Sequence, residues 1–183
     1  MNSHTQPNLS NQDEMPTYVL LSLQEQPYLE IKSGKNIYEY RTRYQKKQTT
    51  AFVYVSRTIK KIMAIIEFET PIIGTDKEIS ELSEKIKPGS YAGMMEYLKK
   101  GTGYAIPVLK MIEIEPVSLS ELKNEFADFV VPQSYYLLNN KEKLLYYLLA
   151  KKHIHTIDFK PMCPNKPDHG FLKTLYKWLT RAC

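Results

Sequence analysis

Residues 37–44 place charged side chains at alternate positions, a spacing that could bind a nucleotide. On a β-strand, Glu39, Arg41 and Arg43 would share one face, about 6.5–7 Å apart. An arginine fork binds phosphate or a guanine edge through paired hydrogen bonds, and a carboxylate accepts one from a base amino group. These residues are candidates for ligand binding, and the alternative is a Glu–Arg ladder on the surface. The polar face predicts that Arg41→Ala weakens binding more than folding.

The same strand belongs to a strongly basic tract. Residues 32–61 hold nine Lys and Arg residues and one acid, Glu39, which gives a net charge of +8, whereas the whole chain carries +5. The further candidates in this tract are Lys35, Ser56, Arg57, Lys60 and Lys61. Concentrated positive charge attracts polyanions and accelerates their binding. The tract therefore predicts contacts with phosphate groups, and the alternative is a solvated surface whose charges serve solubility.

The other reactive residue types form no recognised catalytic or metal-binding pattern. Histidines stand at positions 4, 153, 155 and 169, and cysteines at positions 163 and 183. Their spacing fits no common zinc site, and there is no glycine-rich phosphate loop. We therefore expect neither a metal ion nor a cofactor. Two cysteines are too few for a secreted domain held by disulfides, which favours a cytoplasmic protein.

These candidates need a strand-rich scaffold to position them. Strands are expected at residues 18–23, 37–44, 51–56, 59–69 and 104–113, and helices at 25–33, 76–87 and 90–100. Gly34 follows the first helix, where a left-handed residue is favoured. Ser118 can cap a further helix. This order predicts an α+β class, in which helices flank a small β-barrel.

Four segments, taken in order, resemble the ASCH domain family, which is related to PUA domains. The first contains Gly34 followed by Glu39-Tyr-Arg41, which is similar to the family's glycine, nearby lysine and Glu-x-Arg. The others lie at residues 53–69, 103–106 and 131–135. Together the four segments cover about residues 18–138 in the family's order.

The resemblance implies a closed or nearly closed β-barrel with a cleft in which RNA, a nucleobase or a modified nucleoside binds. It also implies that hydrolytic members use a lysine and a threonine of the glycine segment, where this chain has Asn36 and Glu39. A third catalytic position, a glutamate, falls near residues 88–90, which contain no acid. Asparagine is neither a base nor a nucleophile at pH 7. We therefore expect binding rather than catalysis, with a nucleoside amidohydrolase or ribonuclease as the alternative.

The two ends of the chain differ from this middle part. Residues 1–16 are polar, which predicts a disordered tail without a signal peptide. Residues 17–138 would form the barrel domain, and residues 139–183 a mainly helical extension. Lys173, Lys177 and Arg181 recur every four residues beside an apolar face, which suits packing on the domain, nucleic acid, a membrane surface or an unidentified protein partner. No apolar run approaches the roughly 20 residues that span a bilayer.

Overall fold

The computed structural model describes residues 16–99 and 101–159. The basic residues Lys173, Lys177 and Arg181 of the expected extension, and nearly all of the expected N-terminal tail, lie outside the described residues. The described elements are β1 (Tyr18–Leu23), α1 (Glu25–Lys32), β2 (Tyr38–Arg41), β3 (Thr49–Val55), β4 (Lys61–Phe68), β5 (Ile72–Thr75), α2 (Asp76–Ile86), α3 (Tyr91–Leu98), β6 (Thr102–Ser118), α4 (Leu119–Glu125), β7 (Tyr135–Leu137), α5 (Glu142–Leu149) and β8 (His153–Asp158).

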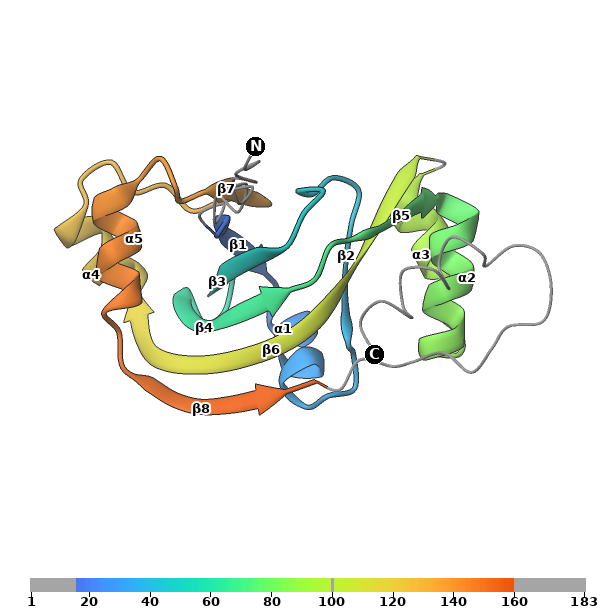
Figure 1. Cartoon of the computed structure of the whole chain (residues 1–183), viewed down its shortest axis with the longest axis horizontal. Helices are drawn as coiled ribbons and strands as arrows, with labels where there is room; N and C mark the ends of the chain where they lie inside the picture. The colour runs from blue at the N-terminus through green and yellow to red at the C-terminus, as the bar shows by residue number, and fades with distance from the viewer. Residues whose placement is uncertain (1–15, 100, 160–183) are drawn as a thin grey trace, which may run out of the picture.

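The strands form one mixed sheet that curls into a half-barrel (Figure 1). They lie in the order β2-β6-β4-β3-β1-β7, and β5 and β8 also pair with β6. Strands β1 and β3 are parallel, whereas the other described pairs are antiparallel. The long strand β6 therefore connects both ends of the molecule. This arrangement of helices around a curled sheet confirms the expected α+β class.

Apolar side chains fill both faces of the sheet. Successive strand residues point to opposite faces, so Ala51, Val53 and Val55 of β3 pack with α1. Phe52 and Tyr54 point the other way and pack with α4 and α5. A third, smaller cluster joins α2 and α3 to β2 and β6. Burial of both faces explains why this strand is a continuous apolar run rather than an alternating one.

Strand β2 is shorter than the expected strand at residues 37–44. It ends at Arg41, so Arg43 lies in the following loop, and the expected face shared by all three charged residues is wrong for Arg43. The three tyrosines of this segment pack in two different clusters. Tyr38 and Tyr40 pack in the cluster with α2 and α3. Tyr44 instead enters the cluster with α1.

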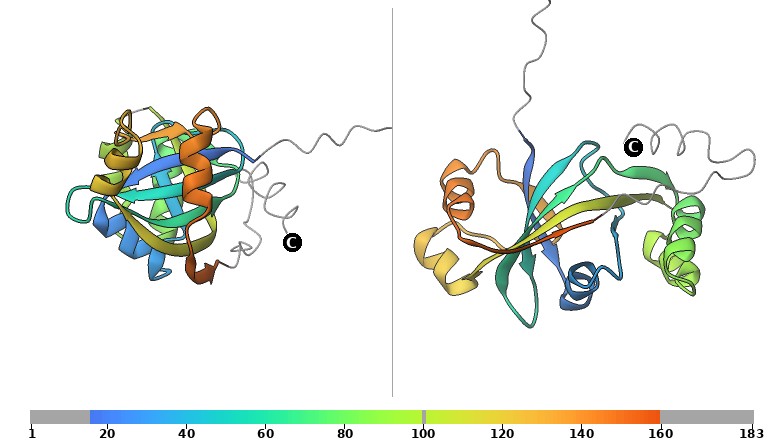
Figure 2. Two further views of the ribbon diagram at one scale, coloured as in Figure 1. Left: turned by 90° about the vertical axis from the view of Figure 1, so that its left-hand side faces the viewer. Right: turned by 60° about the horizontal axis from the view of Figure 1, so that its bottom comes forward.

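The segment after residue 138 contributes to the same sheet and core as the residues before it. Helix α5 buries Leu144, Leu145 and Leu148 against the sheet. Strand β8 pairs with β6, with Asp158 opposite Lys110. Figure 2 shows α4 and α5 at one end of the sheet and α2 and α3 at the other.

Replacing each of two glycines with alanine is expected to change the stability in opposite directions, because their backbone conformations differ. Gly34 has φ of 71°, and a Cβ there would meet open space. We expect Gly34→Ala to lower the free energy of unfolding by about 1–2 kcal/mol, because an L-residue is strained in the left-handed region. Gly93 lies within α3, also in open space, so Gly93→Ala should raise it by up to about 1 kcal/mol. Urea denaturation measures both, and changes of equal sign would contradict these conformations.

Candidate nucleic-acid interface

Glu39 and Arg41 form a buried ion pair on β2. The Nε atom of Arg41 lies 2.7 Å from Oε1 of Glu39. Glu39 is only 6% exposed. Two residues apart on a strand, the side chains point to the same side, as the sequence predicts. However, the carboxylate faces a guanidinium rather than solvent.

The other two nitrogens of the Arg41 guanidinium connect β2 to segments with which it does not pair in the sheet. Its Nη2 donates to the Ser22 carbonyl on β1 at 2.7 Å, and its Nη1 donates to Ser134 Oγ at 3.3 Å. The Ser22 amide in turn donates to the Ser134 carbonyl at 2.8 Å. Strands β1 and β2 are not neighbours in the sheet. The Arg41 side chain therefore bridges the open side of the half-barrel.

The electrostatics of this pair follow from its burial. Desolvation raises the pKa of Glu39, and the Arg41 charge opposes the rise. Burial also raises the pKa of Tyr44 well above its usual range. The Tyr44 ring lies 4.9 Å from that of Tyr135 on β7, whose hydroxyl accepts a hydrogen bond from Gln45 at 3.3 Å. The ion pair therefore lies near the rings of Tyr44 and Tyr135.

Tyr97 of α3 places an aromatic ring beside the same pair. Its hydroxyl donates to the Tyr40 carbonyl at 3.3 Å. Burial raises its pKa, and the charges of Arg41 and Glu39 both act on it. Nevertheless, Tyr97 is 46% exposed. Because stacking needs an accessible ring, this residue is the aromatic candidate next to Arg41.

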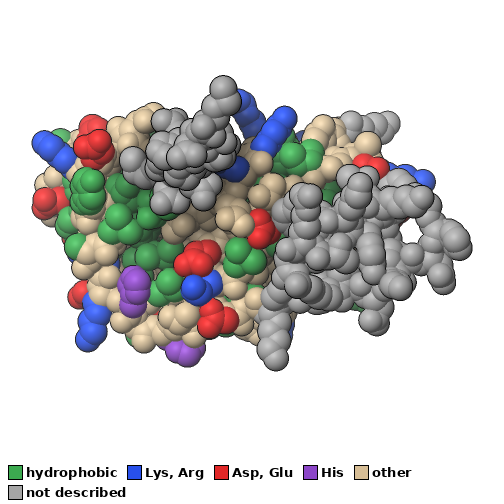
Figure 3. All heavy atoms as spheres, viewed as in Figure 1, with side chains coloured by type: hydrophobic (Ala, Val, Ile, Leu, Met, Phe, Trp, Pro, Cys, Tyr) green, Lys and Arg blue, Asp and Glu red, His purple; other side chains and the backbone are tan. Residues whose placement is uncertain are grey.

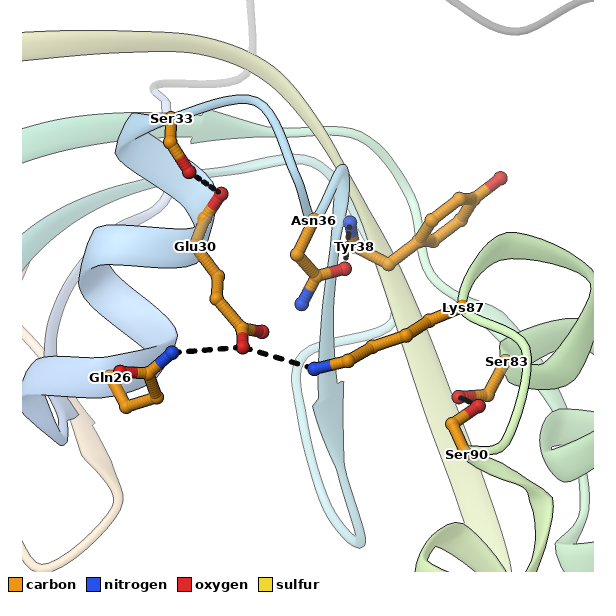
Figure 4. Close-up of polar contacts among 8 residues, drawn as sticks. All are labelled: Gln26, Glu30, Ser33, Asn36, Tyr38, Ser83, Lys87 and Ser90. Atoms are coloured by element: carbon orange, nitrogen blue, oxygen red, sulfur yellow. Dashed lines mark hydrogen bonds and ion pairs between the residues drawn. The ribbon is translucent and has the colours of Figure 1, made fainter.

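A second polar cluster joins α1 to the connection between α2 and α3 (Figure 4). Lys87 Nζ lies 3.0 Å from Glu30 Oε1, and Gln26 Nε2 donates to the same oxygen at 3.1 Å. On the α2–α3 side, the Ser83 and Ser90 hydroxyls are 2.7 Å apart. Ser90 stands just before α3, and its side chain makes no capping hydrogen bond.

Asn36 lies at the entrance to β2, between these two sides. Its Oδ1 accepts a hydrogen bond from the Tyr38 amide at 3.2 Å, while its amide nitrogen points towards the space beside Glu30 and Lys87 (Figure 4). The Asn36 side chain therefore helps to fix the backbone conformation at the start of β2. The neighbouring Lys35 is exposed.

The basic candidates do not form one continuous patch. Arg43 is exposed in the β2–β3 loop, before β3 begins, and Arg57 is exposed after β3 ends. The seven residues of β3 separate them by roughly 20 Å. Figure 3 shows Lys and Arg side chains grouped at the upper edge of this face, over the β2–β3 loop. The +8 tract is thus divided between opposite ends of a strand.

The β3–β4 turn carries the second group. Arg57 and Lys60 have positive φ angles of 64° and 53°, and Lys61 opens β4 as an exposed residue. The hydroxyl and amide of Ser56 both donate to the Leu23 carbonyl, at 3.0 and 2.8 Å. The Ser56 side chain is therefore engaged in holding this turn to β1.

The described residues hold neither a metal-binding cluster nor a membrane-spanning helix. Residues 16–99 and 101–159 contain no group of three or more His, Cys, Asp or Glu side chains placed to hold a metal ion. His153 and His155 lie on exposed positions of β8, whereas Cys163 and His169 lie outside the described residues. None of the helices within these ranges is long and apolar enough to cross a bilayer.

The sequence did not point to Tyr97, Glu30 and Lys87 as candidate site residues. Each meets its partner only through folding, since Tyr97 and Tyr40, like Lys87 and Glu30, are 57 positions apart. Ser134 lies in the fourth segment of the family resemblance, which is the one signal that pointed to it. The rest required the three-dimensional arrangement.

The contacts of Arg41 change the expectation that Arg41→Ala weakens binding more than folding. Truncation leaves Glu39 buried without its counter-ion and opens the bridge to β1, so we expect a loss of about 3–5 kcal/mol in the free energy of unfolding. Arg43→Ala removes an exposed arginine nearby and should change it by less than about 0.5 kcal/mol. Chemical denaturation compares the two variants. Wild-type stability of Arg41→Ala would contradict the bridging role.

Comparisons with known proteins identify the fold. No protein-family model matches the chain, and no curated protein is significantly similar to it. The crystal structure of ASCH from Zymomonas mobilis superposes with a TM-score of 0.64 at 21% identity, covering 75% of this chain and 98% of that chain. Two variants of that protein, one with a tyrosine replaced by phenylalanine and one with a serine replaced by alanine, give TM-scores of 0.63 and 0.62 at 21% identity, covering 74% of this chain and 99% and 96% of theirs. The chain therefore has the ASCH-domain fold, as its sequence resemblance indicates.

Proposed function

We propose that this domain binds RNA at the surface beside the Glu39–Arg41 pair. We call it the Tyr97 surface and define it by Thr42, Arg43, Gln45, Tyr97 and Ser134. The observation that carries the proposal is an exposed aromatic ring next to an arginine whose orientation is already fixed. The function that the ASCH resemblance implies, binding of RNA or of a modified nucleoside, agrees with this chemistry.

The Tyr97 ring supplies a stacking surface. Single-stranded RNA is bound largely through unstacked bases that lie on aromatic side chains. The hydrogen bond from Tyr97 to the Tyr40 carbonyl, 3.3 Å long, restricts the ring before any ligand arrives. A side chain that is already restricted loses less conformational entropy on binding, which lowers the free-energy cost of binding.

Cationic groups on the same surface can neutralise the phosphates. Arg43 is exposed in the β2–β3 loop, one residue after Thr42. The Nη1 atom of Arg41 is held at 3.3 Å from the hydroxyl of Ser134, which is itself exposed. A ligand hydroxyl or phosphate that replaced the serine as acceptor would gain a charge-assisted hydrogen bond. Arg41 would thus both fix the surface and donate to the ligand through Nη1, and Arg43 would contact phosphate.

Replacing the ring tests the stacking role. We expect Tyr97→Ala to weaken binding of an RNA oligomer by about 1–3 kcal/mol, the range for losing one stacked base. Tyr97→Phe keeps the ring and should bind nearly as the wild type does. Tyr146 of α5, which is 67% exposed, provides the matched control, because Tyr146→Ala removes an even more accessible tyrosine ring elsewhere. Fluorescence anisotropy measures all four proteins, and equal losses in both alanine variants would refute the site.

The salt dependence of binding locates the phosphate contacts. Each phosphate contact in a single strand adds about 0.7 to the slope of log affinity against log salt. Arg43→Ala should therefore lower the slope by about that amount, whereas Arg57→Ala, at the other end of β3, should leave it unchanged. A loss of slope in Arg57→Ala alone would move the interface to the β3–β4 turn with Lys60 and Lys61. Binding that does not depend on salt would refute the electrostatic component.

The proposal excludes one hydrolytic route. Glu39 is buried against Arg41, and the side-chain oxygen of Asn36 accepts a hydrogen bond from the Tyr38 amide. Neither side chain can therefore activate a nucleophile for amide hydrolysis. We expect no release of cytidine or acetate when purified protein is incubated with N4-acetylcytidine. Turnover that Glu39→Gln abolishes would identify Glu39 as a base and contradict this expectation. Turnover that survives the substitution would reveal a different catalytic site.

A further inference from the structure

The ion pair between Lys87 and Glu30 lies across the entrance to β2. Figure 4 shows Lys87 reaching from the α2–α3 connection, past the segment that leads into β2, to Glu30 on α1. The Lys87 Nζ and Glu30 Oε1 atoms are 3.0 Å apart. The Gln26 amide donates to the same oxygen at 3.1 Å. One carboxylate oxygen thus receives two donors that come from opposite sides of the gap.

The surroundings of Glu30 favour an anion. Gln26 and Lys87 lower the pKa of Glu30 by stabilising its charged form, and the charge of Lys35 adds to this effect. The Asn36 amide nitrogen points towards the same space (Figure 4). One ammonium group and two amides are therefore directed at the position that one carboxylate occupies, and the exposed Lys35 adds its charge nearby. After Glu30 is counted, the cluster keeps one positive charge.

The pair contributes little to the fold. The Lys87 side chain is well exposed, and exposed ion pairs contribute little to stability. The residues can therefore exchange partners at small cost. This separates them from the Glu39–Arg41 pair, whose burial makes either partner costly to remove.

We propose that Lys35 and Lys87 form a phosphate subsite that Glu30 occupies when no ligand is bound. The subsite rests on the proposed RNA-binding function and takes a backbone phosphate of the same RNA. From Asn36 to Arg41 the chain spans roughly 16 Å if it is extended, so β2 leads from this subsite to the Tyr97 surface. A single strand lying along β2 could place a phosphate at one end and a base at the other. Glu30 competes with the phosphate for Lys87 and thereby limits the affinity.

The charge-neutral variant Glu30→Gln tests the competition. It removes the competing charge while keeping the shape of the side chain, so we expect binding of an RNA oligomer to become roughly two- to fivefold tighter. The slope of log affinity against log salt should steepen by about 0.7, the contribution of one additional phosphate contact. Lys87→Ala should weaken binding in the wild-type background and abolish the gain in the Glu30→Gln background. Thermal melts verify that all variants are folded.

Glu81→Gln is the matched control, because Glu81 pairs with Lys77 on the exposed side of α2 at 4.0 Å. It changes the net charge by the same amount, so an equal gain in this variant would reduce the effect to general charge and overturn the subsite. Unchanged affinity in Glu30→Gln would overturn it too, while Tyr97→Ala would still report on the Tyr97 surface. If the wild type bound no RNA at low salt, the proposed function and the subsite would both fail.

Discussion

The guanidinium of Arg41 holds together a part of the half-barrel that backbone hydrogen bonds do not reach. Arginine stays protonated in a protein, so its burial requires acceptors on every side. Glu39, the Ser22 carbonyl and the Ser134 hydroxyl provide them from three separate segments. Because a buried charge that loses its partner is strongly destabilising, these segments have to stay in place. The backbone under the Tyr97 surface is thereby fixed before a ligand binds.

Much of the fold could be predicted from local patterns. Apolar runs indicated β1 and β3, and Gly34 marked the end of α1 with a left-handed residue. The strands β5 and β7, with four and three residues, are too short to show a period. They form because β6 and β1 offer backbone partners. Strand β6 extends well beyond the expected residues 104–113, since pairing with four other strands compensates for Pro107 within it.

The site was less predictable, because proximity in sequence is not proximity in space. Nine basic residues crowd into residues 32–61, yet β3 carries the chain from one end of the sheet to the other between Arg43 and Arg57. Conversely, Arg41 and Ser134 are 93 positions apart and are in contact. Alternation correctly put Glu39 and Arg41 on one side of β2. It could not show that they face each other in a buried space, since that depends on where β1 and β7 lie.

The central claim is that RNA lies on the Tyr97 surface. Titrating isotopically labelled protein with an RNA oligomer, and following the backbone amide signals by NMR, tests it most directly. We expect the largest shifts at Thr42, Arg43, Tyr97 and Ser134, with α4 and α5 unaffected. Shifts confined to the β3–β4 turn or to α4 and α5, or no shifts at low salt, would contradict the claim.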